Sequence, residues 1–260
     1  MSKELILCEI RDHVATVVLN NPPLNVVTLE LTRGLGKTLD GLLENDEVRV
    51  VIVTGAGEKA FCAGSDVNEF PGMMEPGQVV TKKLWRQNET YSKLDDFPKP
   101  TIAALNGHAY GGGLELAVCC DLLVAEEQTR LCLPEIKLGV FPGSGGPVRV
   151  TRRIGEGRAK EMMFFGEPID AATALSWGLV NRIVPQGQSL SVAREMAAVL
   201  VQRPRYALQL CKAAIDLAFD IPEDQVISRS LGLMDKAFSS PECKEGVRAF
   251  FAKEKPQFTR

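Results

Sequence analysis

The chain has 260 residues, of which 45% are hydrophobic and 24% are charged, a composition typical of a soluble globular protein with enough material for a large core. The formal net charge of −3 argues against a dedicated nucleic-acid-binding protein. The seven cysteines include no CxxC pair and no Cys/His spacing typical of a metal site, so we expect packed, reduced thiols. The sequence has neither a secretory signal nor a membrane-spanning apolar run, which predicts a cytoplasmic protein that binds no membrane.

The N-terminal part of the chain predicts alternating strands and helices. Two apolar runs within residues 5–19 flank a polar turn and predict a hairpin. Thr28 is a helix N-cap candidate, and leucines recur at helical spacing over residues 29–45. The β-branched run at residues 48–54 predicts a strand that is covered on both faces.

Loop and helix signals follow. Residues 58–66 predict a loop, and the small residues after Phe61 indicate close approach of the backbone to a neighbour. Residues 67–77 contain two Pro-Gly pairs and predict an irregular segment. Helical spacing resumes over residues 79–96, and the prolines just beyond end that helix.

The stretch at residues 101–121 carries the strongest chemical signal. It contains a predicted buried strand at 102–105, the glycine run 111–113 and a predicted buried helix at 114–120. Three glycines at a helix N-terminus allow close approach, and the free N–H groups there favour negative charge. Glu115 lies beside these donors in apolar surroundings, which indicates an oxyanion hole with an acid/base candidate. Tight strand–helix packing with a glutamate that complements the helix dipole explains this stretch equally well.

The remaining pattern completes an α/β fold class. It predicts strands at 122–126 and 179–184 and helices at 148–155, 158–165 and 171–177. From residue 191 onward the pattern is helical, with breaks at prolines. Alternating strands and helices followed by a helical tail are typical of an α/β protein. No GxSxG nucleophile elbow is present.

Six motifs in this order resemble the enoyl-CoA hydratase/isomerase, or crotonase, family over essentially the whole chain: NNPPLNVV, FCAGSD, NGHAYGGGLELAVCCD, LPEIKLGVFPGSGG, GLVNRIV and KEGVRAFFAKEKPQF. The resemblance implies a crotonase-like spiral of repeated β-β-α units, with the acyl-CoA site, in residues 1–195. It also implies a C-terminal helical trimerisation region at 196–260, and a homotrimer or a dimer of trimers. It implies no metal and no separate cofactor, because coenzyme A is part of the substrate.

The family's catalytic residues map onto this sequence by motif. The resemblance implies that the backbone N–H groups of Ser65 and Gly112 form an oxyanion hole, and that Glu115 and Glu135 are the acid/base pair. Burial in apolar surroundings raises the pKa of a glutamate and suits it to proton transfer near neutral pH.

Several of these residues have a structural alternative. Glu135 has one in a surface ion pair with Lys137 or Arg130. His108 is expected to pack beside the glycines rather than react. Met73 and Met74 line an acyl tunnel or only fill a loop.

The resemblance also implies a set of substrate-binding residues: Leu24, Val26, Ala63, Ser65, Asp66, Val67, Asn68, Gly112, Phe251 and Lys255. Phe251 and Lys255 are expected near the nucleotide, contributed by a neighbouring subunit. A solvated tail charge is the alternative for Lys255.

Two glutamates together predict an enoyl-CoA hydratase, since in the family this pair holds the water that adds to a trans-2-enoyl-CoA. Alternatives within the family are an enoyl-CoA isomerase, a lyase, a decarboxylase or a hydrolase. Leu133 stands where the family commonly has Gln, and Pro147-Val148 stand where it has Thr-Gln. A non-catalytic acyl-CoA-binding or RNA-binding relative is the rival of another class, and the acidic balance counts against RNA.

Overall fold

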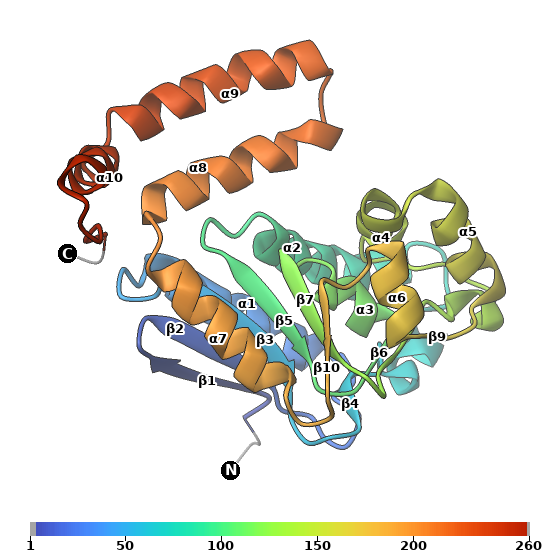
Figure 1. Ribbon diagram of the computed structural model, residues 1–260. Helices are drawn as coiled ribbons and strands as arrows, with labels where there is room; N and C mark the ends of the chain where they lie inside the picture. The colour runs from blue at the N-terminus through green and yellow to red at the C-terminus, as the bar shows by residue number, and fades with distance from the viewer. Residues whose placement is uncertain (1–3, 259–260) are drawn as a thin grey trace.

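The computed structural model describes residues 4–258, which form two β-sheets surrounded by helices (Figure 1). In spatial order, the larger sheet contains β1 (Ile6–Arg11), β2 (Val14–Leu19), β3 (Val50–Gly55), β5 (Thr101–Leu105), β7 (Leu122–Glu126) and β10 (Arg182–Val184). The smaller sheet contains β4 (Ala60–Cys62), β6 (His108–Tyr110), β8 (Arg130–Cys132) and β9 (Ile169–Asp170). Only the β1–β2 and β8–β9 pairs among these strands are antiparallel.

The helices lie between successive strands or follow the last strand. They are α1 (Leu29–Glu44), α2 (Trp85–Asp95), α3 (Gly112–Ala117), α4 (Gly146–Ile154), α5 (Glu156–Phe165), α6 (Ala171–Trp177), α7 (Ser189–Val201), α8 (Arg205–Asp216), α9 (Glu223–Phe238) and α10 (Pro241–Ala252). Shorter turns are the 3₁₀ segments η1 (Val67–Met73), η3 (Glu135–Leu138) and η4 (Leu217–Phe219), and the π-helical turn η2 (Val80–Leu84). The turns that begin at β3, β5 and β7 each add one strand to the larger sheet, one strand to the smaller sheet and then a helix, so the predicted β-β-α repeat is confirmed.

Strand β3 is buried along its whole length because helices cover both faces of the larger sheet. Its residues Val51 and Val53 belong to the core that includes the leucines of α1, while Val50 and Ile52 pack in the core that includes α7. Thr28 caps α1, as predicted, by accepting a hydrogen bond from the N–H of Leu31 at 3.0 Å. The strand predicted to be covered on both faces is therefore confirmed.

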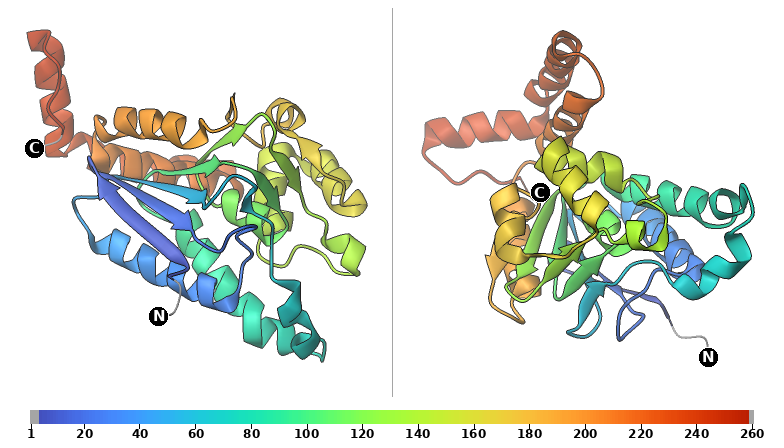
Figure 2. Two further views of the ribbon diagram at one scale, coloured as in Figure 1. Left: turned by 90° about the horizontal axis from the view of Figure 1, so that it is seen from below. Right: turned by 90° about the vertical axis from the view of Figure 1, so that its right-hand side faces the viewer.

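The last three helices project from the body of the molecule, as two further views show (Figure 2). Their exposed apolar side chains include Ile215, Phe219, Ile227, Leu231, Met234, Phe238, Phe250 and Phe251. The boundary expected between residues 195 and 196 lies inside α7, so the projecting part begins after that helix. No helix within residues 4–258 has the length and apolar character needed to cross a membrane.

Several predicted element bounds were wrong. Residues 60–62, which were predicted as loop, form a strand, because they pair in the smaller sheet with residues 108–110, for which no element was predicted. Residues 67–73 form a 3₁₀ helix, in which the Asp66 side chain accepts from the N–H of Asn68. The helix predicted at 114–120 begins at Gly112 and ends at Ala117, and the strand predicted at 179–184 covers only Arg182–Val184.

Candidate active site

The first part of the site is the N–H group of Ser65, just beyond strand β4. Val27 pairs with the two neighbouring peptide groups: its N–H donates to the Gly64 carbonyl at 2.8 Å, and its carbonyl accepts from Asp66 at 3.0 Å. Because successive peptide groups of an extended chain point to opposite sides, the N–H of Ser65 points away from Val27. No carbonyl or side chain within residues 4–258 accepts from it.

The second part is the glycine run at the start of α3. Gly111 has a φ of 50°, which favours glycine, and its N–H donates to the Cys132 carbonyl at 2.8 Å. A Cβ at Gly113 would lie 2.1 Å from the Cys62 carbonyl oxygen, so helix α3 packs directly on strand β4. This packing brings Gly112 beside Ser65, since a Cβ at Gly112 would lie 3.7 Å from the Ser65 nitrogen. No group within residues 4–258 accepts from the Gly112 N–H either, and two adjacent free N–H groups suit an oxyanion hole.

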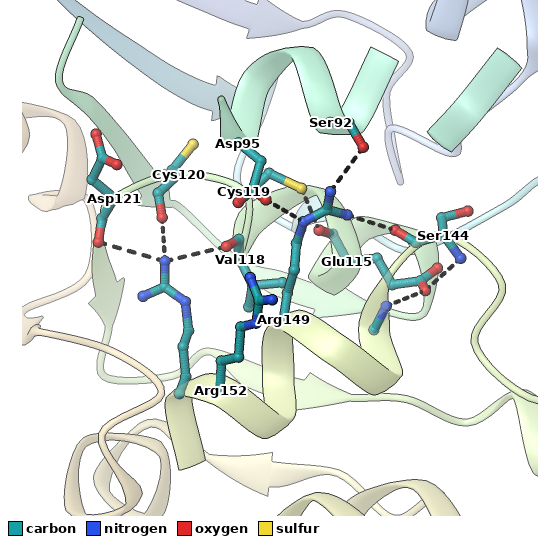
Figure 3. Close-up of polar contacts among 12 residues, drawn as sticks. Ser92, Asp95, Glu115, Val118, Cys119, Cys120, Asp121, Ser144, Arg149 and Arg152 are labelled. Atoms are coloured by element: carbon teal, nitrogen blue, oxygen red, sulfur yellow. Dashed lines mark hydrogen bonds and ion pairs between the residues drawn. The ribbon is translucent and has the colours of Figure 1, made fainter. Parts of the chain in front are cut away.

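Glu115 lies on the next turn of α3 and is only 2% exposed. Its Oε1 accepts hydrogen bonds from the N–H of Ser144 at 2.7 Å and of Gly146 at 2.8 Å, at the N-terminus of α4 (Figure 3). Burial raises the pKa of this carboxyl, while the two N–H donors and the charge of Arg149 act in the opposite direction. The pKa of Glu115 is raised overall, and the two N–H donors stabilise its ionised form against the effect of burial.

Glu135 begins the short 3₁₀ segment η3, and its carboxylate receives fewer hydrogen bonds than that of Glu115. Its Oε2 is buried without a hydrogen-bond partner among the described residues, and its Oε1 faces Gly111, where a Cβ would lie only 2.9 Å away. Burial, together with the nearby charge of Glu115, raises the pKa of Glu135 to about 7. This carboxyl therefore exchanges a proton near neutral pH.

A single cavity of about 800 Å³ joins these groups, since Ser65, Gly112, Glu115 and Glu135 all line it. Its other lining residues are mostly apolar: Ala63, Val67, Phe70, Met73, Met74, Val79, Val80, Leu84, Pro134, Leu138, Val140 and Phe141. A few polar groups therefore lie in a mostly apolar cavity, as in many small-molecule sites.

The cavity contains only some of the predicted substrate-binding residues. Ala63, Ser65, Val67 and Gly112 line it, whereas Leu24, Val26, Asp66, Asn68, Phe251 and Lys255 do not. The Leu24 carbonyl accepts from the N–H of Ala63 at 2.9 Å, which places that loop beside the cavity strand. Phe251 and Lys255 are exposed at the end of the projecting helices, and their predicted contact with the nucleotide stays a prediction.

The structural alternatives for two residues are now resolved. Lys137 pairs with Glu167 at 2.8 Å and Arg130 lies 4.0 Å from Asp170, so neither cation pairs with Glu135. His108 stacks on Tyr110, and its Nδ1 accepts from the N–H of Arg130 at 3.2 Å. The predicted packing role of His108 agrees with this position outside the cavity lining.

Sequence reasoning missed the residues that hold Glu115. The N–H groups of Ser144 and Gly146 come from a turn about thirty residues further along the chain. The motif GSGG was visible, but a glycine-rich turn by itself does not reveal which side chain it contacts. Lys83 was also missed: it lines the cavity, is 2% exposed, and pairs with Glu69 at 2.5 Å.

The two departures from the family pattern have clear positions. Leu133 is fully buried in the main core, next to the segment that carries Glu135. Pro147 is exposed in the first turn of α4, where proline is compatible with a helix. Neither residue lines the cavity. Within residues 4–258, no group of His, Cys, Asp and Glu side chains gathers in an arrangement that could hold a metal ion.

Comparison with known proteins agrees with this geometry. A family model described as enoyl-CoA hydratase/isomerase matches residues 9–260. A short-chain-enoyl-CoA hydratase of Clostridium acetobutylicum is 36% identical over 253 residues, which cover 96% of this chain and 95% of that protein. A crystal structure of an enoyl-CoA hydratase from Bacillus anthracis matches with a TM-score of 0.93 and 35% identity, over 98% of this chain and 99% of that one. DspI of Pseudomonas aeruginosa matches with a TM-score of 0.92 and 33% identity, over 98% and 97% of the two chains. The resemblance seen in the sequence motifs is confirmed, and the chain belongs to the enoyl-CoA hydratase/isomerase family.

Proposed function

We propose that this protein is an enoyl-CoA hydratase that adds water across the double bond of trans-2-enoyl-CoA thioesters. One observation carries the proposal: two carboxylates in contrasting environments line the same cavity as two adjacent free N–H groups. Relatives named short-chain-enoyl-CoA hydratase and crotonyl-CoA hydratase, at 36% and 31% identity, support the same reaction.

The contrast between the glutamates supports a division of roles. Glu115, held by two N–H donors, is the base that takes a proton from water as the water oxygen bonds to Cβ. The electron pair of the double bond moves to the thioester oxygen, and the N–H groups of Ser65 and Gly112 stabilise the resulting enolate. Glu135, whose pKa is raised to about 7, gives its proton to Cα. The product is a 3-hydroxyacyl-CoA, and one water has been consumed.

The rest of the site fits a thioester with an apolar acyl group. The cavity wall on the side of η1 and η2 is lined with Val, Met, Phe and Leu side chains, which favour a hydrocarbon chain. Coenzyme A enters as part of the substrate, and the proposed steps use no separate cofactor. We also propose that the exposed apolar helices α8 to α10 form the contacts of a trimer, since large exposed apolar patches mark protein interfaces.

The experiment that tests the function follows the loss of the enoyl-thioester absorbance with crotonyl-CoA and with a longer trans-2-enoyl-CoA. We expect rapid loss with the wild type and a decrease in kcat of roughly 10²- to 10⁴-fold for Glu115→Gln and for Glu135→Gln. Glu167→Gln is the control. It removes the surface carboxylate that pairs with Lys137, and the variant should retain full activity.

A different family activity would give a different result. If the wild type leaves both enoyl thioesters unchanged but converts a 3-enoyl-CoA into the conjugated 2-enoyl-CoA, the proposed hydration is wrong and the protein is an isomerase. If Glu115→Gln hydrates crotonyl-CoA at the wild-type rate, the role proposed for Glu115 is wrong.

A further inference from the structure

The turn that holds Glu115 is itself held by two side chains: Asn88 of α2 donates to the Gly143 carbonyl at 2.9 Å, and Arg149 of α4 contacts the next residue. The guanidinium Nη1 donates to the Ser144 carbonyl at 3.2 Å, and Ser144 is the residue whose N–H donates to Glu115. On its other side the guanidinium Nε donates to Asp95 at 2.8 Å, and Nη2 donates to the Ser92 hydroxyl at 3.0 Å. Arg149 therefore connects helix α2 to the turn that carries the Glu115 donors (Figure 3).

The backbone of the turn is shaped to receive this side chain. Gly145 has a φ of 98°, in the left-handed region that favours glycine. A Cβ at Gly145 would lie 2.1 Å from Arg149 Nη1, so the guanidinium occupies the space that any larger residue would need. Gly146, the second donor to Glu115, follows directly and begins α4. The positions of the Ser144 and Gly146 N–H groups thus depend on the contacts that the Arg149 guanidinium makes.

Arg149 also acts on Glu115 through its charge. Among the groups that face Glu115, Arg149 is the cation, and its charge lowers the pKa of the Glu115 carboxyl. The other titratable groups near Glu115 are Glu135, Tyr91 and Cys119. Tyr91 and Cys119 are neutral, and none of the three is a cation. Asp95, together with Asp96, holds Arg149 in its charged form. Arg149 does not line the cavity, so it reaches the reaction only through Glu115 and its turn.

We propose that Arg149, anchored by Asp95 and Ser92, is a positioning residue that aims the Glu115 carboxylate and favours its ionised form. The proposal rests on the hydratase function, in which Glu115 acts as the base. A guanidinium suits this task because its planar fork makes several hydrogen bonds in fixed directions, which an ammonium group does not. A misplacement of a catalytic group by about 1 Å lowers rates by about 10²-fold.

The test compares Arg149→Gln, Arg149→Lys and the matched control Arg152→Gln. Arg152 lies on the same helix and pairs with Asp220 at the surface, so the control also removes one cation from α4. For Arg149→Gln we expect kcat to fall roughly 10- to 100-fold, with KM changed less than about threefold because the residue does not touch the cavity. The acid limb of the kcat profile should move to higher pH, because loss of the cation makes Glu115 harder to ionise. Arg149→Lys keeps the charge, so its acid limb should stay near that of the wild type while kcat is only partly restored.

Two further measurements keep the outcome decisive. Ser92→Ala removes one anchor without changing any charge, and should lower kcat about two- to tenfold without moving the acid limb. Infrared difference spectra against Glu115→Gln report the protonation of Glu115 without any turnover, so they read the effect of Arg149 even if the wild type does not hydrate enoyl thioesters. If Arg149→Gln lowers only the melting temperature and leaves kcat, the acid limb and the infrared signal unchanged, Arg149 is merely structural and the proposal is wrong.

Discussion

The two glutamates of the cavity are held in opposite ways. Around Glu115, glycines bring backbones into contact, and the carboxylate receives two N–H donors at the start of a helix. At Glu135, one carboxylate oxygen is buried without a partner among residues 4–258. Burial raises the pKa of both carboxyls, but Glu115 alone of the two receives this pair of N–H donors, and a reaction with one base and one acid requires such a difference in environment.

The outer part of the cavity extends this contrast. Met74 and Phe141, which line it, are 78% and 73% exposed. They lie on short segments beside η1 and after η3, whereas Glu115 lies on a helix that packs on a buried strand. A rigid chemical end and an open apolar end suit a substrate that has one fixed reacting group and an acyl chain of variable length.

The largest expected effect on stability comes from Gly113→Ala, which disturbs the tight packing of helix α3 on strand β4. The added Cβ would lie 2.1 Å from the Cys62 carbonyl oxygen, so helix α3 must move away from strand β4. We expect a loss of about 3 kcal/mol in the free energy of unfolding, because overpacking in a close-packed region forces backbone shifts. Displacement of the Gly112 N–H should lower kcat/KM for crotonyl-CoA by roughly 10²- to 10³-fold.

Gly157→Ala in helix α5 is the matched control for that change. A Cβ at Gly157 would meet no atom within 4 Å, so the helix gains up to about 1 kcal/mol from the better propensity of alanine. Thermal unfolding and crotonyl-CoA turnover measure both variants. Equal behaviour of the two alanine variants would show that the close contact of α3 with β4 has no role in the site.

The surroundings of Glu135 are tested by the pH dependence of stability in Glu135→Gln. The pKa of Glu135 is raised in the folded protein to about 7, so the unfolded chain releases this proton at lower pH than the folded one. Wild-type folding is therefore unaffected by this group below its unfolded pKa, and is progressively destabilised as the pH rises from that pKa to about 7. Glutamine carries no charge, and we expect the variant to be more stable than the wild type by about 2 kcal/mol at pH 8 and equal to it at pH 4.

Melting temperatures at the two pH values measure this effect. The control is Glu167→Gln, which breaks an exposed ion pair with Lys137 and should change stability by less than about 1 kcal/mol. A Glu135 variant that is less stable than the wild type at pH 8 would mean that the Glu135 carboxylate is well hydrogen-bonded in the folded protein. The contrast between the two glutamates would then be lost.

Local patterns predicted most of this fold, and long-range contacts account for what they missed. The β-branched run of β3 and the Thr28 cap of α1 depend on neighbours in the sequence and were predicted from it. The strands β4, β6 and β8 have three residues each, too few for a period, and exist only because they pair with one another.

The same distinction applies to the site. The motifs predicted Glu115, Glu135, Ser65 and Gly112 as candidates, and the fold brings all four to one cavity. Their electrostatic difference was not predictable, because it depends on donors about thirty residues away for one glutamate and on a buried oxygen without a partner among residues 4–258 for the other. Sequence spacing does not encode the number of hydrogen bonds that a buried carboxylate receives.

The smallest expected effect concerns Ser144, which holds Glu115 through its backbone and also lines the cavity. Its N–H donates to Glu115, but its hydroxyl is buried beside the cavity without a partner among residues 4–258. Alanine keeps the N–H and removes a hydroxyl that the protein leaves unsatisfied, so Ser144→Ala should leave stability equal to the wild type or raise it by about 1 kcal/mol. If the hydroxyl binds the attacking water or the new 3-hydroxyl group, kcat/KM should fall two- to tenfold, the value of one neutral hydrogen bond. Turnover of crotonyl-CoA and of its hydrated product measures this change in both directions. An unchanged kcat/KM with a higher melting temperature would mean that polar contact with the substrate beside Ser144 comes from the Glu115 carboxylate and the backbone N–H groups alone.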